Sequence, residues 1–283
     1  MKSILIKLIL ALVLLILGAC NGKTKPEPGS YVVLSPEVAE IIAALGAADE
    51  ISGLTRECTY PPQLQEKVIV GDFGAINKET VLRLSPQIVF TSALEQEAIT
   101  LDLQKLGIRV HKSYPKTMAD MLDEIITIGE LIGRSAEARA LRDSLEREIA
   151  AISQEAAGKT RPKVYLEIYR DPLMSVADNS FVGELIELAG GDNVFDRLER
   201  DYARVKAEQV VEANPDIMIC YSQDTLQNVI SRKGWGRIPA ISQRRIYFED
   251  AIDPDLIQRA GPRSISGMRL LANIFEQWRR ETE

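Results

Sequence analysis

The chain has 283 residues, of which 46% are hydrophobic and 27% charged, a length and composition that fit a folded protein of two lobes. Its formal net charge is −7 and it contains no long basic run, so we exclude nucleic acid as a partner, because such binding depends on neutralising phosphates. Lys2 and Lys7 precede an apolar run at 8–17, which predicts a signal peptide over residues 1–19. That run is about half of the roughly 20 residues that a membrane-spanning helix needs.

The signal peptide ends in Leu-Gly-Ala-Cys, which resembles the bacterial lipobox, where the cysteine is acylated and becomes the mature N-terminus. Cys20 would then carry a lipid; the alternative is an ordinary secretory signal that ends beside a cysteine. The polar, proline-containing residues that follow suit a tether better than a core. We therefore expect a lipidated tether at 20–30. The protein would be extracytoplasmic and membrane-anchored, in the periplasm or on the outer face of the cytoplasmic membrane.

From Tyr31 onward, short apolar runs alternate with helical patterns, which predicts an α/β fold. After a strand at 31–34, Ser35 and Pro36 mark the start of a helix and Gly46 marks its end. The alternation continues with strands at 51–54, 68–70, 88–90 and 109–111 and helices at 78–84 and 95–106. We assign residues 31–133 to an N-terminal α/β lobe.

The middle of the chain has the pattern of one long amphipathic helix. Apolar residues recur there at three- and four-residue spacing with charges between them: Ala138, Leu141, Leu145, Ile149 and Ile152. A helix at 135–157 would be about 33 Å long. We expect a linker helix within 134–160, which implies limited hinge motion. Residues 161–283 form a C-terminal α/β lobe, from a strand at 163–169 to a closing helix at 262–278.

An internal repeat supports two equivalent lobes. The sequence ETVLRLSPQIVF begins at Glu79 and EQVVEANPDIMI begins at Glu208. Each has a glutamate, an apolar pair two and three residues later, and a proline before a buried type of strand. The same offset separates the two glutamates and the two prolines. An ordinary helix followed by a strand can give a similar pattern, because proline often follows a helix.

Several segments, in this order, resemble the helical-linker (class III) periplasmic binding proteins that serve ABC importers for cobalamin, iron-siderophores and haem. They are VVLSPEVAEIIAALGAADEISGLT, ECTYPPQL and LQKLGIRV in the first half and SFVGELIELAGGDNVF, KGWGRIPAI, RRIYF and RAGPR in the second. The resemblance covers essentially the whole mature chain. It implies two α/β lobes joined by one long rigid helix, with a ligand cleft between them. We expect a monomer that delivers a small molecule to the transmembrane subunits of a permease.

The resemblance also gives a role to the repeated glutamates. In that family a glutamate on each lobe forms salt bridges with arginines of the permease, and Glu79 and Glu208 match those positions. The alternative is that each is a solvated acid in the first turn of a helix, where the helix dipole favours negative charge. Their equal distance from a proline in both halves favours docking, a contact that sets orientation and encounter rate more than affinity.

The resemblance is closest to the vitamin-B12-type cobalamin-binding proteins and implies five ligand contacts. Tyr60 matches a tyrosine that faces the corrin ring, and an aromatic face suits a flat macrocycle. Tyr202 matches a position that is usually aromatic, and Phe195 lies in the same loop; for both, simple packing is an equal alternative. Asp255 and Arg259 match an aspartate and an arginine that reach the corrinoid amides, although their four-residue spacing also fits a plain helical ion pair.

The ligand remains open between a corrinoid and a ferric siderophore or haem. The cobalamin proteins carry a tryptophan after the strand that here ends at Phe90, whereas this chain reads TSALEQ. Siderophore sites favour arginines because their ligands are negatively charged. Four arginines could supply that charge: Arg56, Arg170, Arg204 and Arg259.

The sequence contains no phosphate-binding glycine loop, nucleophile elbow or cysteine cluster, so we predict no catalytic residues and no cofactor. An exported enzyme that uses only carboxylates is the second alternative. We expect no metal site, because such sites need several ligands and His111 is the single histidine. Cys58 and Cys220 fall in different halves, so we expect two free thiols. Trp235 has the character of a packing residue.

Overall fold

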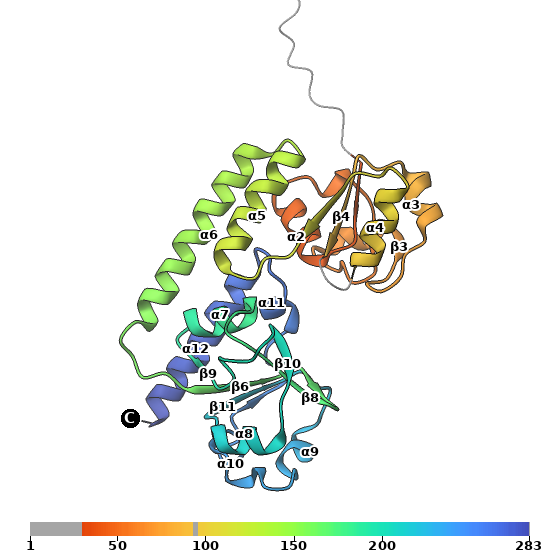
Figure 1. Cartoon of the computed structure of the whole chain (residues 1–283). Helices are drawn as coiled ribbons and strands as arrows, with labels where there is room; N and C mark the ends of the chain where they lie inside the picture. Colours follow the sequence, from red (N-terminus) through yellow and green to blue (C-terminus); the bar gives the residue numbers. More distant parts are fainter. Residues whose placement is uncertain (1–29, 93–95, 283) are drawn as a thin grey trace, which may run out of the picture.

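The computed structural model describes residues 30–92 and 96–282. The predicted signal peptide, Cys20 and most of the tether lie outside these residues. Two α/β lobes are stacked and joined along one side by long helices, which confirms the predicted fold class (Figure 1). In the described part of the chain, no helix has the length and apolar character needed to cross a membrane.

The N-terminal lobe is built on a parallel five-stranded sheet with the order β3-β2-β1-β4-β5. Its strands are β1 (Tyr31–Val33), β2 (Ile51–Thr55), β3 (Val68–Gly71), β4 (Ile88–Ser92) and β5 (Val110–Ser113). Its helices are α2 (Pro36–Ala44), α3 (Lys78–Leu84) and α4 (Glu97–Lys105), with 3₁₀ turns at Ala48–Glu50 and Pro62–Glu66. α2 begins with a proline, whose fixed φ suits the first turn, and it is followed by Gly46 at φ 74°, a conformation that glycine adopts without strain.

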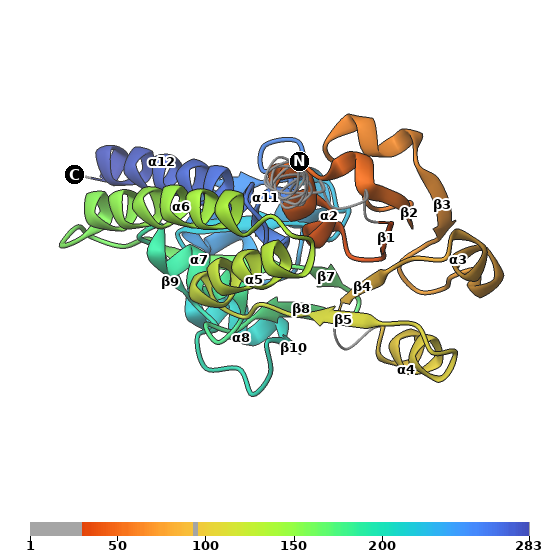
Figure 2. The same cartoon turned by 90° about the horizontal axis from the view of Figure 1, so that it is seen from above.

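Two antiparallel helices, α5 (Met118–Leu131) and α6 (Ser135–Ala156), connect the lobes (Figure 2). α5 starts with a capping box in which Thr117 and Asp120 satisfy each other's backbone N–H groups. α6 lies within the predicted linker range of 134–160 and runs down the side of both lobes. The C-terminal helix α12 (Ser264–Thr282) lies beside it, so the linker is packed on both sides.

The C-terminal lobe has two sheets. A parallel sheet of order β12-β11-β6-β9 contains β6 (Lys163–Glu167), β9 (Asp192–Asn193), β11 (Ile217–Cys220) and β12 (Ile246–Tyr247). An antiparallel sheet of order β10-β8-β7 contains β7 (Tyr169–Arg170), β8 (Leu173–Val176) and β10 (Tyr202–Arg204). The helices are α7 (Phe181–Leu188), α8 (Ala207–Ala213), α9 (Leu226–Ile230), α10 (Pro239–Ser242), α11 (Pro254–Gln258) and α12, with a 3₁₀ turn at Trp235–Arg237. The strand predicted at 163–169 is therefore divided between β6 and β7.

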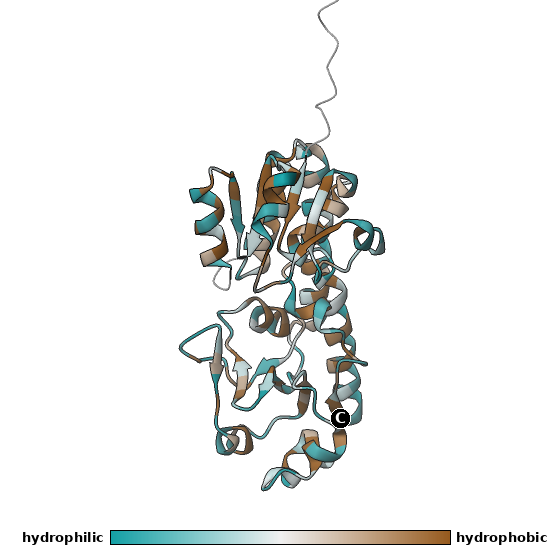
Figure 3. Ribbon diagram, turned by 90° about the vertical axis from the view of Figure 1, so that its right-hand side faces the viewer, coloured by the Kyte–Doolittle hydropathy of each residue, from teal (hydrophilic) through white to brown (hydrophobic). Residues whose placement is uncertain are grey.

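Buried hydrophobic residues form three clusters, and alternate residues of a strand contribute to different ones. Hydrophobic and hydrophilic segments are interspersed along the ribbon of both lobes (Figure 3). In β1, Val33 faces a large cluster shared by both lobes, whereas Val32 faces a smaller one inside the N-terminal lobe. In β11, Ile219 faces the shared cluster and Met218 a cluster inside the C-terminal lobe. Trp235 is 1% exposed and belongs to that last cluster, as its packing character predicts.

Candidate ligand cleft

A cavity of about 210 Å³ lies between the lobes, and both lobes contribute to its walls. The N-terminal lobe supplies Glu37, Phe73 and Tyr114, and the C-terminal lobe supplies Asp201 and Tyr202. The N-terminal residues follow the carboxyl ends of parallel strands, where ligands bind in open α/β sheets. The cavity is therefore the candidate ligand cleft, and Tyr202 is the predicted contact residue that lines it.

The cleft is closed in this structure. Asp201 of the C-terminal lobe accepts a hydrogen bond from the Tyr114 hydroxyl, with 3.0 Å between Oη and Oδ2. The Lys116 ammonium forms an ion pair with the same carboxylate at 3.0 Å. The cavity is smaller than the roughly 300–1,000 Å³ of typical small-molecule sites. Both bridges join the two lobes across the cleft.

Gln96 fixes the N-terminal wall of the cleft from behind. Its buried Oε1 accepts from the Ser92 backbone at 2.8 Å, and its Nε2 donates to the carbonyls of Leu34 and Phe73 at 2.9 and 3.2 Å. Because a buried amide left without these partners is costly, the side chain holds three separate loops in place. This role could not be predicted from the sequence, since glutamine is usually exposed.

A cluster of ionised groups lies beside the cleft and crosses between the lobes. We call Glu40, Asp255, Arg259 and Arg263 the interlobe ion cluster. Glu40 on α2 is 3% exposed, and its carboxylate accepts from Arg263 at 2.6 and 2.8 Å and from Arg259 at 3.2 Å. Arg259 also pairs with Asp255 at 2.9 Å, so the helical ion pair considered as an alternative for these two residues is present.

Tyr60 borders this cluster. The residue is 43% exposed, and the Arg263 guanidinium lies 4.1 Å from the ring centroid, within the range of a cation–π contact. Arg259 in addition donates to the backbone carbonyl of Glu57, in the same loop as Tyr60, at 3.1 Å. Burial raises the pKa of Asp255, and the positive charge of Arg259 opposes that shift.

The structure thus brings together three of the five predicted contact residues, Tyr60, Asp255 and Arg259, and places Tyr202 in the adjoining cavity. Phe195 lies elsewhere. It is 8% exposed, and its ring packs edge-on against Tyr165 with 5.7 Å between centroids. Of the two interpretations left open for Phe195, packing inside the C-terminal lobe is the one seen here.

The predicted docking glutamates sit on equivalent helices. Glu79 and Glu208 are exposed residues in the first turns of α3 and α8. Each helix ends in a left-handed residue, Ser85 at φ 47° or Asn214 at φ 51°, before a proline and a buried strand. The repeat seen in the sequence is therefore also a repeat of local structure.

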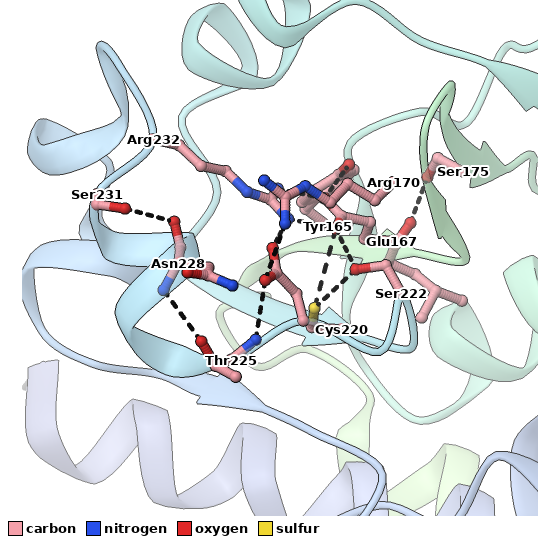
Figure 4. Close-up of polar contacts among 12 residues, drawn as sticks. Tyr165, Glu167, Arg170, Ser175, Cys220, Ser222, Thr225, Asn228, Ser231 and Arg232 are labelled. Atoms are coloured by element: carbon pink, nitrogen blue, oxygen red, sulfur yellow. Dashed lines mark hydrogen bonds and ion pairs between the residues drawn. The ribbon is translucent and has the colours of Figure 1, made fainter.

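A buried ionic cluster in the C-terminal lobe includes Arg170, one of the four arginines that could bind a negatively charged siderophore (Figure 4). Glu167 is fully buried and accepts from Arg232 at 2.6 and 2.7 Å and from Ser222 at 2.6 Å. Asp224 pairs with Arg232 at 2.8 Å and with Arg170 at 3.0 Å. Arg170 therefore already has a carboxylate partner.

His111 and the two cysteines contact other protein side chains and do not line the cleft. His111 Nε2 lies 2.7 Å from Glu124 Oε1, and the imidazole packs edge-on against Phe90. Cys58 and Cys220 are free thiols, as predicted, and both are buried; burial raises the pKa of Cys58 to about 12. Among residues 30–92 and 96–282 no group of three or more histidines, cysteines and acids is placed to hold a metal ion.

Comparison with known proteins agrees with this fold. The chain is 29% identical over 256 residues to the uncharacterized ABC transporter substrate-binding lipoprotein YvrC of Bacillus subtilis, covering 88% of this chain and 80% of the relative. The crystal structure of the vitamin B12 binding protein of Vibrio cholerae superposes with a TM-score of 0.77 at 21% identity, over 89% of this chain and 99% of that one.

A haem-binding protein from Roseiflexus superposes equally well, with a TM-score of 0.79 at 23% identity over 89% of this chain and 99% of the other. The fold is thus shared by proteins with different ligands. The sequence pattern of the family described as periplasmic binding proteins matches residues 32–252, most of the chain. This chain therefore belongs to the periplasmic binding protein family, whose members bind substrates for transport and are not enzymes.

Proposed function

We propose that the protein is the lipid-anchored binding component of an ABC importer and that it carries a corrinoid between its lobes. The charge of the cleft is the observation that carries the choice of ligand. Acids outnumber bases around it: Glu37, Glu40, Asp201 and Asp255 against Lys116, Arg259 and Arg263. This balance of charge favours a neutral ligand over an anionic one, and the rim of a corrinoid bears neutral amides.

The same observation disfavours an anionic ligand. Arg259 is bound to Glu40 and Asp255, and Arg170 is bound to Asp224, so both would have to exchange a protein carboxylate for a ligand carboxylate. The exposed ring of Tyr60 beside this cluster offers an apolar face to a flat macrocycle. The structurally similar protein of Vibrio cholerae binds vitamin B12, which is a corrinoid, and this similarity supports the same ligand class here.

Haem or a ferric siderophore is the second candidate, supported by a different surface. A cavity of about 440 Å³ next to β10 is lined by Met174, Arg200, Tyr202 and Arg204, among others. Two arginines beside a tyrosine and a thioether fit a ligand that carries both iron and carboxylates. The Roseiflexus neighbour is a haem-binding protein.

Isothermal titration of the polypeptide that begins at Asn21 distinguishes these ligands. We expect one-to-one binding of cyanocobalamin, and no comparable heat from haemin or ferric siderophores. Tyr60→Ala should weaken cobalamin binding roughly tenfold, because a ring face of that size contributes on the order of 1.5 kcal/mol. Tyr60→Phe keeps the ring and is the matched control. Binding of haemin without cobalamin would remove the corrinoid from the proposal.

Docking through Glu79 and Glu208 is tested by uptake of radiolabelled cobalamin in cells that depend on this chain. The variant Glu79→Ala/Glu208→Ala should bind cobalamin normally but lose most uptake. Glu66→Ala/Glu249→Ala removes two exposed glutamates of the same lobes from other positions and should transport normally. Normal uptake by the first variant would contradict the docking assignment.

A further inference from the structure

Each predicted docking glutamate has an exposed aliphatic residue one helical turn further on. Leu82 on α3 is 44% exposed and follows Glu79 by three positions; Val211 on α8 is 38% exposed and follows Glu208 by three positions. On a helix, residues three apart are neighbours on the same face, with Cβ atoms roughly 5–6 Å apart. Each lobe therefore presents a carboxylate and an aliphatic side chain side by side.

The two helices hold these pairs in the same way. The residue between them, Val81 or Val210, is fully buried and fixes which face of the helix points outward. Leu82 and Val211 belong to none of the hydrophobic clusters found among the described residues. The pairs are therefore exposed features of two packed helices, α3 in the N-terminal lobe and α8 in the C-terminal lobe (Figure 1).

Single exposed apolar residues are common and need no explanation, but these two occupy equivalent positions in a duplicated motif. The offset that relates the glutamates also relates Leu82 to Val211. Applied to the other exposed leucines, the same offset pairs Leu101 with the partly buried Ile230, Leu106 with the buried Trp235 and Leu226 with Glu97. Among these leucines, only Leu82 has an exposed aliphatic residue at the equivalent position of the other lobe.

We propose that Leu82 and Val211 complete two equivalent docking patches, each made of one carboxylate and one aliphatic side chain. The partner is a membrane permease whose two transmembrane subunits present the same surface twice, with a cationic side chain next to an apolar hollow. The carboxylate orients the encounter, and burial of the aliphatic group supplies affinity. This inference rests on the proposed transport function and adds a second kind of contact to it.

Site-specific photocrosslinking in the native host tests the contact directly. A photoreactive amino acid is introduced into the full-length chain at position 82, 211, 79 or 208, and at 101 or 226 as controls with similar exposure. We expect positions 82 and 211 to crosslink to the transmembrane subunit of an ABC importer, identified by mass spectrometry, and positions 101 and 226 not to do so.

The importer identified in this way is then purified in nanodiscs and titrated with the soluble chain. Leu82→Gln/Val211→Gln should bind it about a hundredfold more weakly, since each buried aliphatic contact contributes roughly tenfold and the variant loses two. Glutamine keeps helix propensity while removing the apolar group. Leu101→Gln/Leu226→Gln should bind like the wild type, and both variants should bind cyanocobalamin equally, which shows that they are folded.

The outcomes separate this inference from the function on which it rests. Crosslinks from 79 and 208 without crosslinks from 82 and 211, or unchanged affinity of Leu82→Gln/Val211→Gln, would overturn the aliphatic patches and leave the glutamates in place. No crosslink from any of the four positions would overturn both. Crosslinks from 82 and 211 in a protein that fails to bind cobalamin would support the patches and reject only the ligand.

Discussion

Glu40 joins the two lobes through its ion pairs with Arg259 and Arg263. Its carboxylate is almost completely buried and is surrounded by Arg259 and Arg263, which are themselves 15% and 19% exposed. A buried ion pair adds little net stability compared with an apolar pair, but removing one partner leaves charges buried without compensation. The interlobe ion cluster is therefore sensitive to substitution even though its net contribution to stability is small.

We predict that Glu40→Gln lowers the free energy of unfolding by about 3 kcal/mol, because two guanidinium groups lose their common carboxylate. Urea denaturation followed by circular dichroism measures this change. Glu146→Gln breaks the exposed i,i+4 pair with Arg142 and should cost less than about 1 kcal/mol. Equal stability of the two variants would show that the cluster is as solvated as a surface pair.

A second prediction concerns pH and Glu37, which lines the cleft. Burial raises the pKa of Glu37, and the charge of Arg259 only partly opposes the shift. Because the folded state then binds the proton more tightly than the unfolded state, stability falls as pH rises from the unfolded pKa, about 4.3, through the folded pKa. At neutral pH the ionisable side chain of Glu37 is therefore a cost to the folded state.

Glu37→Gln should therefore raise stability at pH 7 and flatten its dependence on pH above about 4.3. Urea unfolding of the variant and the wild type at a series of pH values between 4.5 and 8 measures the difference. The exposed Glu66→Gln is the control and should leave the pH dependence unchanged. A variant curve parallel to the wild type would mean that Glu37 keeps an ordinary pKa in the fold.

At the scale of elements, the packing of α5 on α6 decides how stiff the linker is. The helices approach closely at Gly129, where a Cβ atom would lie 2.3 Å from the Cβ of Ala138 and 3.1 Å from the carbonyl oxygen of Arg134. Only a residue without a side chain allows that approach. The crossing point is thus set by one glycine and one alanine.

Gly129→Ala should lower the free energy of unfolding by about 1–3 kcal/mol, since the clash outweighs the gain in helix propensity. Thermal unfolding checks this result. Gly129→Ala/Ala138→Gly removes the opposing methyl group and should restore part of the loss. The exposed neighbour Glu130→Ala has no such contact and should change stability little. A stabilised single variant would mean that the helices can separate without cost.

The elements themselves were largely predictable, because the signals that define them are local. Pro36 and Gly46 mark the two ends of α2, and α3 has the bounds that its pattern predicts. The candidate site was harder to predict from the sequence. Tyr60 and Arg259 were found by resemblance, whereas the pairing of Glu40 with Arg263 joins residues more than two hundred positions apart, a contact for which one sequence contains no local signal.

Considered as a whole, the molecule is held together differently on its two sides. On the linker side, one hydrophobic cluster runs through both lobes and includes Val33, Ile128, Leu145, Leu166 and Leu271. On the cleft side, the contacts are polar. Apolar packing resists separation over its whole area, whereas a few hydrogen bonds can be exchanged for water at small net cost. We therefore expect the cleft to open by a small rotation about the linker side.

Asp201 is the group that should control this opening, because it receives both the Tyr114 and the Lys116 bridges. A protein held closed binds its ligand only from the minor open population, so removing the bridges should raise the observed association rate. We predict that Asp201→Ala binds cyanocobalamin several-fold faster in stopped-flow fluorescence, with faster dissociation as well.

Asp196→Ala is the matched control, since it removes an exposed aspartate with the same charge from the same loop and should leave both rates unchanged. If Asp201→Ala instead slowed association, the carboxylate would be acting on the ligand and not on the opposite lobe. A rise in both rates with little change in affinity would place Asp201 at the barrier to opening. The stiffness of the linker would then limit how far the lobes part, and the polar bridges would limit how often.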